Sequence, residues 1–193
     1  MIYSLAGRLS LKRDKFVVVE SGGVGLKVAV SSAALNSLPA VGSPVNFFCH
    51  LRVKEDALEL YGFLSEEELD FFELLNGVSG VGPKSALAVL ALDKVENLEA
   101  AIAEGKSELL TRVSGIGRKT AERIILDLKD KMTRGRSAEL VGKMESDLDL
   151  EEALAGLGYR RFAVKEAIKK IPKEISGMES RLREALKILG NKK

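Results

Sequence analysis

Val78-Ser-Gly-Val-Gly-Pro-Lys-Ser-Ala86 is a glycine-rich segment that recurs, with an offset of 35, as Val113-Ser-Gly-Ile-Gly-Arg-Lys-Thr-Ala121. Both copies keep the valine, the serine, the two glycines, the lysine and the alanine at matching positions. In each copy a helical pattern precedes the glycines and another follows them. The duplication therefore predicts two helix-turn-helix units, because a solenoid needs more repeats than two.

The two glycines of each turn point to a ligand. They allow positive φ angles and let a ligand approach the backbone closely. The helix that follows begins with N–H groups that have no partner inside the helix, and its dipole favours an anion. A phosphate group fits such a site well. We therefore predict phosphate contacts at the backbone of Val78, Gly80, Gly82, Val113, Gly115 and Gly117, with charges from Lys84, Arg118, Lys119 and Arg123.

The repeat also permits two other interpretations. Gly77, Gly82 and Lys84 nearly match a nucleotide-binding P-loop, but Pro83 separates the second glycine from the lysine, which the motif requires to be adjacent. Glycines also commonly end helices without binding a ligand. Because both copies retain the lysine, phosphate binding is favoured over simple helix termination.

The charge is distributed unevenly along the chain. The net charge of +2 over 193 residues does not by itself indicate a nucleic-acid partner. Residues 1–64 carry 7 basic and 5 acidic side chains, residues 65–132 carry 9 and 13, and residues 133–193 carry 14 and 10. The middle segment, which contains the repeat, is thus net acidic. If this segment binds DNA, it must do so through a local basic face, because its overall charge opposes attraction.

Changes of pattern along the chain divide it into domains. The first part has short β-branched runs separated by turn signals, which predicts a five-stranded OB barrel, with an SH3-like barrel as the alternative. The pattern then switches to helical period, later loses any clear period, and ends in a three-helix bundle. The turn Leu157-Gly158-Tyr159 in this bundle resembles the loop of ubiquitin-associated domains. The expected parts are the barrel at residues 1–64, the tandem hairpin domain at 65–132, a flexible linker at 133–147 and the bundle at 148–193.

Cysteine and histidine use restricts the chemistry. Cys49 and His50 are the single Cys and His, so neither an intramolecular disulfide nor a structural zinc site can form. Adjacent residues of a strand point to opposite faces, which disfavours a catalytic pair and favours a core thiol. The chain also lacks a signal pattern and an apolar run long enough to span a membrane, so we expect a cytoplasmic protein.

The repeat has the pattern of the helix-hairpin-helix motif, a sequence-independent binder of the DNA backbone. Together with the other parts, the whole chain resembles the RuvA family, which recognises Holliday junctions in bacteria. The segments that carry this resemblance are Gly22-Gly23-Val24-Gly25, Lys54-Glu55-Asp56-Ala57, Leu60-Tyr61-Gly62-Phe63, Gly80–Lys84, Gly115–Arg123 and Ala153–Tyr159.

The resemblance implies a homotetramer, single or paired, that holds a four-way DNA junction open and nearly planar. Its hairpin amides would contact phosphates without reading bases. Glu55 and Asp56 match the family's acidic pin, whose four copies would meet at the junction centre and repel phosphates there. Lys54, beside the pin, would contact a nearby phosphate. From the residues alone, an ordinary acidic turn and a solvated surface lysine remain open.

For the C-terminal bundle the resemblance implies a partner. The turn Leu157-Gly158-Tyr159 would bind RuvB, the hexameric ATPase that drives branch migration; the alternative is that Leu157 and Tyr159 fill a small core. The motor uses the ATP, and we expect no cofactor or metal in this chain. A junction resolvase is a further expected partner. The implied processes are homologous recombination, DNA repair and the SOS response to DNA damage.

Two rival functions stay open on the residues. Helix-hairpin-helix motifs also occur in glycosylases and structure-specific nucleases; Asp127 follows the second hairpin, but a salt-bridged surface carboxylate is favoured there. An OB barrel can bind single strands by stacking bases on aromatic rings, but Phe16, Phe47 and Phe48 lie in apolar strands and predict a core. The residues show no catalytic constellation, and the resemblance implies a non-catalytic DNA-binding subunit of a branch-migration helicase complex.

Overall fold

The computed structural model describes residues 2–132, 137–172, 175 and 177–190. The chain forms two compact units, Met1–Ser137 and Ala138–Lys193. Within the described ranges, no helix combines the length and the apolar character needed to cross a membrane.

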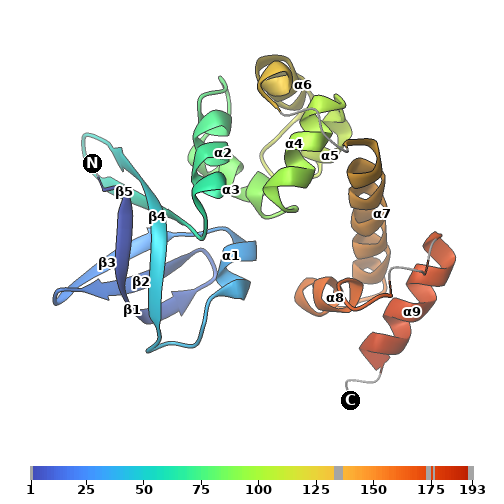
Figure 1. The fold of residues 1–193 in the computed structure, drawn as a ribbon, viewed down its shortest axis with the longest axis horizontal. Helices are drawn as coiled ribbons and strands as arrows, with labels where there is room; N and C mark the ends of the chain where they lie inside the picture. The colour runs from blue at the N-terminus through green and yellow to red at the C-terminus, as the bar shows by residue number, and fades with distance from the viewer. Residues whose placement is uncertain (1, 133–136, 173–174, 176, 191–193) are drawn as a thin grey trace. The chain divides into compact units, whose positions relative to one another are not determined.

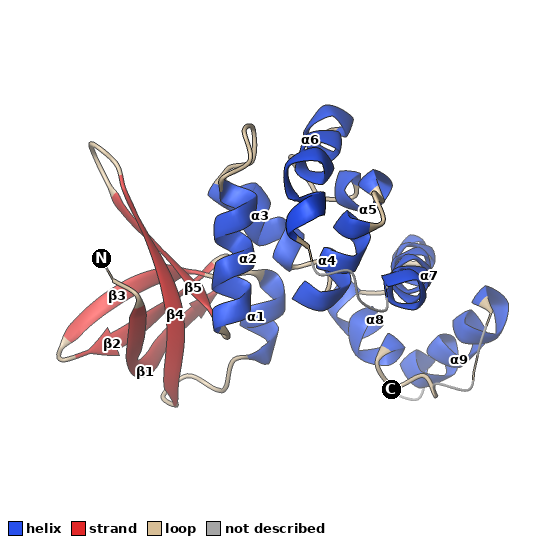
Figure 2. Cartoon of the chain, turned by 45° about the horizontal axis from the view of Figure 1, so that its top comes forward, coloured by secondary structure: helices blue, strands red, loops and turns tan. Residues whose placement is uncertain are grey.

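The first unit begins with a closed five-stranded barrel, which confirms the predicted OB-like architecture (Figures 1 and 2). Its strand order is β1-β2-β3-β5-β4, with antiparallel neighbours except for the parallel pair β3 and β5. A short helix follows β3, and its N-cap Ser31 accepts a hydrogen bond from the Ala34 N–H at 3.0 Å. The elements are β1 Ser4–Arg13, β2 Phe16–Ser21, β3 Val24–Ala29, α1 Ser32–Ser37, β4 Pro44–Val53 and β5 Leu58–Phe63.

Alternation along the strands fills the barrel with branched side chains. Val17 and Val19 on β2, Val28 on β3 and Phe47 on β4 are fully buried. Gly62 makes room for this packing, because a Cβ there would lie 2.4 Å from Val28 Cγ1. Burial of each such side chain contributes about 1.5–3 kcal/mol. Several of them together stabilise the barrel core, although the chain has no tryptophan.

The three phenylalanines expected in this core have different environments. Only Phe47 is buried, whereas Phe16 and Phe48 are half-exposed. The Lys27 Nζ lies 4.5 Å from the centroid of the Phe16 ring, and Tyr3 meets the Phe48 ring edge-on. The prediction was therefore wrong for Phe16 and Phe48, because both rings lie on the outside of the barrel beneath partial covers that the strand pattern does not reveal.

Cys49 and His50 point to opposite faces of β4, as their adjacency predicts. Cys49 is buried in the barrel core, and this burial raises the pKa of its thiol to about 11. The His50 Nδ1 lies 2.9 Å from the Glu73 Oε1, and its ring centroid lies 5.4 Å from that of Phe72. Both partners belong to helix α2, Glu66–Asn76, so His50 connects the barrel to the helices.

The rest of the first unit is helical. Ser65, the N-cap of α2, accepts a hydrogen bond from the Glu68 N–H at 3.2 Å, while the Glu68 carboxylate accepts one from the Leu64 N–H at 2.9 Å. The first bond caps the start of α2, and the second differs from a capping box in that the carboxylate accepts from the residue before the N-cap. The elements are α2 Glu66–Asn76, α3 Pro83–Leu90, α4 Val95–Ala103, α5 Ser107–Thr111, α6 Arg118–Leu128 and the 3-10 turn Lys129–Lys131.

The barrel and the hairpin helices share one aromatic interface. The Phe72 ring on α2 lies 4.8 Å from the Phe63 ring and 5.4 Å from the Tyr61 ring, centroid to centroid. The Tyr3 hydroxyl donates to the Glu66 carboxylate beside it. The parts expected at residues 1–64 and 65–132 thus belong to one compact unit.

The second unit is a small helical bundle. Its helices are α7 Ser137–Gly156, α8 Arg161–Ile168 and α9 Met178–Gly190, and its core contains Leu150, Leu154, Val164 and Ala185. The linker expected at residues 133–147 differs from the structure, because α7 already begins at Ser137. Six of the eleven residues 137–147 are good helix formers (Ala, Glu, Leu, Lys and Met), so helix propensity outweighs the missing period. Residues 133–136 lie outside the described residues.

Candidate nucleic-acid interface

The first glycine-rich turn joins α2 to α3. Gly80 has φ +90°, a conformation that favours glycine, and the Val81 N–H donates to the Val78 carbonyl at 3.0 Å to close the turn. Val78 and Val81 are buried and anchor the turn to the helices. Gly82 then serves as the N-cap of α3, with Pro83 at the first helical position. The exposed part of the turn therefore includes glycine backbone that no Cβ covers.

The second turn repeats this geometry between α5 and α6. Gly115 also has φ +90°, and the Ile116 N–H donates to the Val113 carbonyl at 3.0 Å. Gly117 is the N-cap of α6, with φ −85° against −93° for Gly82. The sequence repeat is thus a structural repeat at the level of individual hydrogen bonds.

The two turns also lie against each other. A Cβ built on Gly80 would lie 3.9 Å from the Thr120 Oγ1, and one built on Gly115 would lie 3.4 Å from the Ser85 Oγ. Ser85 and Thr120 occupy equivalent places in the two copies, so the contact is reciprocal. The sequence does not show this pairing, which makes the two hairpins one pseudo-symmetric unit.

The N-termini of α3 and α6 have the properties of anion sites. Neither N-cap glycine supplies a side-chain cap, and neither first turn contains an acidic residue. Among the described residues, the amides of Gly82 and Ser85 donate to no protein group, and the same holds for the equivalent amides of Gly117 and Thr120. These amides and the helix dipoles are therefore available to an external anion.

Lysines reinforce both sites. Lys84 and Lys119 occupy the first turns of α3 and α6, are exposed, and form no ion pair within the described part of the chain. A cation at a helix N-terminus opposes the dipole. An anion that binds both the amides and the lysine removes this conflict.

Other predicted phosphate ligands already have protein partners. The Arg118 Nε donates to the Glu122 Oε1 at 3.0 Å, and the Arg123 Nη1 donates to the Ser79 carbonyl at 3.2 Å. Arg118 remains largely exposed, so its ion pair is weak and open to exchange. The sequence showed these charges but not their partners.

Lys54 also bonds within the chain. Its Nζ lies 2.6 Å from the Glu59 Oε1, and the Tyr61 hydroxyl donates to the other oxygen of Glu59 at 2.8 Å. The hydrogen bond from Lys54 is the largest of the causes that lower the pKa of Glu59. Burial, followed by the bond to Glu59, raises the pKa of Tyr61 to about 12. Glu59 thus competes with any phosphate for Lys54.

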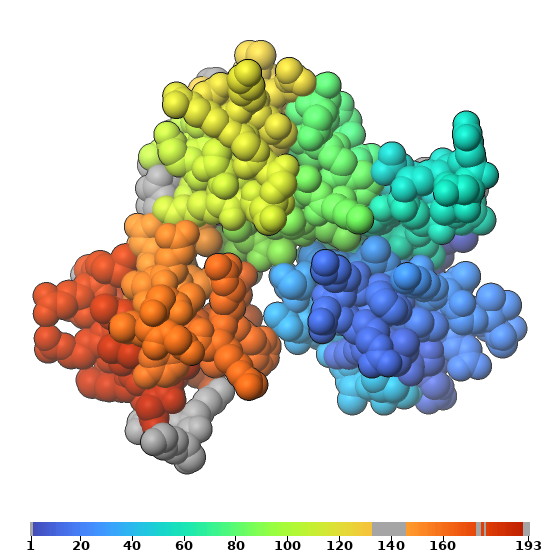
Figure 3. Space-filling model, turned by 180° about the vertical axis from the view of Figure 1, so that it is seen from behind, coloured from blue at the N-terminus to red at the C-terminus, as the bar shows by residue number. Residues whose placement is uncertain are grey.

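Glu55 and Asp56 form the tip of the hairpin between β4 and β5. The Lys54 N–H donates to the Ala57 carbonyl at 2.8 Å and closes the turn, and both carboxylates are exposed. The tip projects from the surface of the first unit in Figures 2 and 3. Below it, the cross-strand pair Val53 and Leu58 is 69% and 73% exposed, an apolar feature that strand alternation alone did not indicate.

The C-terminal turn is exposed too. Gly158 has φ +89°, and Leu157 and Tyr159 are 61% and 37% exposed. The alternative in which both side chains fill the core is therefore wrong for Leu157. Phe162, 56% exposed at the start of α8, was not predicted and lies close in sequence to this apolar turn.

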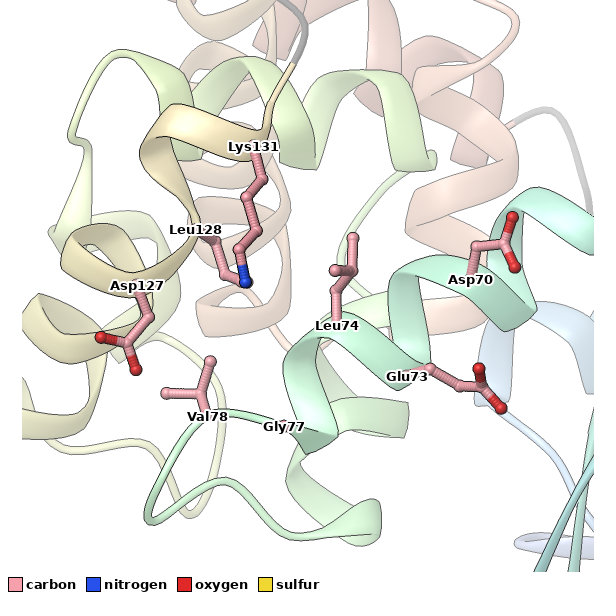
Figure 4. Close-up of a pocket in the computed structure, with 8 residues that line it drawn as sticks. All are labelled: Asp70, Glu73, Leu74, Gly77, Val78, Asp127, Leu128 and Lys131. Carbon is pink, nitrogen blue, oxygen red and sulfur yellow. The ribbon is translucent and has the colours of Figure 1, made fainter.

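A cavity of about 760 Å³ lies between α2 and α6 (Figure 4). Its lining includes the carboxylates of Asp70, Glu73 and Asp127 and the ammonium group of Lys131. Three carboxylates to one cation make this cavity unfavourable for a phosphate. Asp127 is exposed and forms no ion pair with any described residue, so the expected salt bridge was wrong.

Comparison with known proteins covers nearly the whole chain. The model of the RuvA N-terminal domain matches residues 1–62, that of the SAM-like helix-hairpin-helix tandem matches residues 72–130, and that of the RuvA C-terminal domain matches residues 149–190.

Curated relatives agree with these matches. A protein of Geobacter sp. (strain M21) is 38% identical over 98% of this chain and 99% of its own length, and one of Dehalococcoides mccartyi (strain CBDB1) is 38% identical over 100% of both chains. A third, from Prosthecochloris aestuarii, is 39% identical over 95% of each. All three are named Holliday junction branch migration complex subunit RuvA. With the barrel, the paired hairpins and the helical C-terminal unit all matched along one chain, this protein belongs to the RuvA family.

Proposed function

We propose that the protein binds four-way DNA junctions as a homotetramer, through phosphate backbones and without reading base sequence. The observation that carries the proposal is the pair of uncapped helix N-termini at Gly82 and Gly117, each with unused amides and an unpaired lysine in the described structure. Backbone amides have no base specificity, so such contacts position a duplex but do not select a sequence.

The β4–β5 tip supplies selectivity for the junction. Glu55 and Asp56 are exposed at the end of a projecting hairpin, where carboxylates repel phosphates. In a four-fold tetramer, four such tips meet at the axis, which suits the open centre of a planar junction and disfavours a continuous duplex. The names of the relatives support this reading, since they place those proteins in a Holliday junction complex.

The C-terminal unit binds the RuvB motor in this proposal. Its exposed apolar side chains, Leu157, Tyr159 and Phe162, provide a surface of the kind that protein partners cover. The chain itself has no catalytic role: the motor hydrolyses ATP, and the hairpins deliver the junction to it.

A competition experiment tests the proposal. The full-length chain is offered a labelled four-way junction together with unlabelled junction, linear duplex or single strand. We expect unlabelled junction to displace the labelled junction at a concentration at least tenfold lower than duplex or single strand. A mass measurement with and without DNA should detect the tetramer. Equal competition by all three DNAs would remove the junction function, and turnover of damaged or nicked DNA would remove the non-catalytic assignment.

A further inference from the structure

Arg123 links the two hairpins in one direction only. It lies on α6, which follows the second hairpin, yet its Nη1 donates to the carbonyl oxygen and to the Oγ of Ser79, both at 3.2 Å. Ser79 belongs to the turn of the first hairpin. The offset of the repeat places Ala88 at the position equivalent to Arg123, and Ala has no group that could donate to Ser114 in the second turn. The two hairpins are therefore not equivalent.

The bonded carbonyl controls a neighbouring donor. The Ser79 C=O and the Gly80 N–H belong to the same peptide unit, which is planar and trans, as are all the described peptide bonds. In a trans peptide the C=O and the N–H point in opposite directions. A guanidinium group that holds the carbonyl therefore also sets the direction of the Gly80 N–H, and directs it away from Arg123.

Glycine alone would leave this peptide poorly fixed. Gly80 has φ +90° and little side-chain packing to restrict it, so its peptide plane has more freedom than that of any other residue type. A hydrogen bond from a charged donor restricts the plane and also polarises the amide. The second turn, with Gly115 at the same φ, has no such bond from a described residue.

From this geometry we propose that Arg123 is a positioning residue: it orients the backbone of the first hairpin for a DNA phosphate and is not itself the main cation for that phosphate. The inference rests on the proposed function, since it assumes that the hairpin amides bind phosphate. It differs from the expectation of the sequence, in which Arg123, like Lys119, supplies a charge to a DNA phosphate.

The test compares Arg123→Met with Lys119→Met in the full chain. Both variants remove one positive charge from α6, both side chains are exposed, and only Arg123 contacts the first turn. Two measurements are made: the amide NMR resonances of Gly80 and Gly115 in the DNA-free protein, and the dependence of junction affinity on salt concentration.

We expect Arg123→Met to shift the amide resonance of Gly80 and to leave that of Gly115 unchanged. It should weaken junction binding about tenfold, with an unchanged slope of log affinity against log salt concentration. Lys119→Met should leave the Gly80 resonance unchanged and should reduce this slope by about 0.9 for each phosphate that the protein no longer neutralises. If Arg123→Met leaves Gly80 in place and reduces the slope as Lys119→Met does, the proposal is overturned. If the wild-type chain binds no DNA, the proposed function fails, while the Gly80 resonance still decides whether Arg123 orients the turn.

Discussion

Replacing Gly82 with Ala separates the ligand role of a hairpin glycine from its role in the fold. Gly82 has φ −93° and ψ 169°, an extended conformation that Ala adopts without strain, and a Cβ there meets no heavy atom within 4 Å. Ala is a poorer N-cap than Gly by roughly 0.5 kcal/mol, but it stabilises by about 0.4–1 kcal/mol through the unfolded chain. Since these effects nearly cancel, we expect the melting temperature to change by less than about 2 °C.

Binding should respond much more strongly than stability. The added methyl group occupies open space beside the unused amides, where a phosphate must approach the backbone. Loss of one charge-assisted hydrogen bond costs about 1.5–3 kcal/mol, so Gly82→Ala should weaken junction binding at least tenfold. Gly117→Ala should have a similar effect through the second hairpin. Fluorescence anisotropy with a labelled junction measures the affinity, and circular dichroism measures the melting temperature.

Two further glycines serve as controls. Gly156 also has no heavy atom within 4 Å of an added Cβ but lies in the C-terminal unit, so Gly156→Ala should leave junction affinity unchanged. Gly80 has φ +90°, so Gly80→Ala should lower stability by about 1–2 kcal/mol through backbone strain. Wild-type affinity in Gly82→Ala would refute the reasoning, because it would mean that no phosphate approaches this helix N-terminus.

Three other predictions follow from the tip, the unit boundary and the buried thiol. Replacing Glu55 and Asp56 with Ala should tighten binding to linear duplex and lower the preference for the junction in competition assays; an unchanged preference contradicts the pin. A chain ending at Ser137 keeps the first unit whole and should retain junction binding but lose stimulation of the RuvB ATPase, whereas loss of DNA binding would contradict this division of labour. Because burial raises the pKa of Cys49 to about 11, the stability from its neutral thiol is complete below the ordinary value of 9.0 and is lost as the pH rises through about 11. Urea unfolding at pH values across this range should show a fall in the free energy of unfolding that is absent in Cys49→Ala. If the free energy of unfolding falls equally steeply with pH in both proteins, the buried thiol is not the cause.

Local patterns were sufficient for the elements and for the backbone of the candidate site. Strand alternation predicted the barrel, and the doubled glycine motif predicted two turns that open helices, because φ preferences, capping and periodicity act over a few residues. The same locality explains why a linker was expected where α7 begins at Ser137: the segment has no hydrophobic period and is nevertheless helical. Adjacency on a strand was likewise enough to place Cys49 inside the barrel and His50 on its outer face.

The sequence by itself determined which groups could bind a phosphate: the glycine backbones and the basic side chains near them. Only the tertiary structure decided which of these groups are still available. Lys54 is paired with Glu59, and Arg123 reaches Ser79 across a separation of 44 residues, while Lys84 and Lys119 have no partner among the described residues. The reason is physical: turns and helices form from interactions between near neighbours in the chain, whereas the partner of a long charged side chain depends on which distant segments the folded core brings within about 3 Å of it.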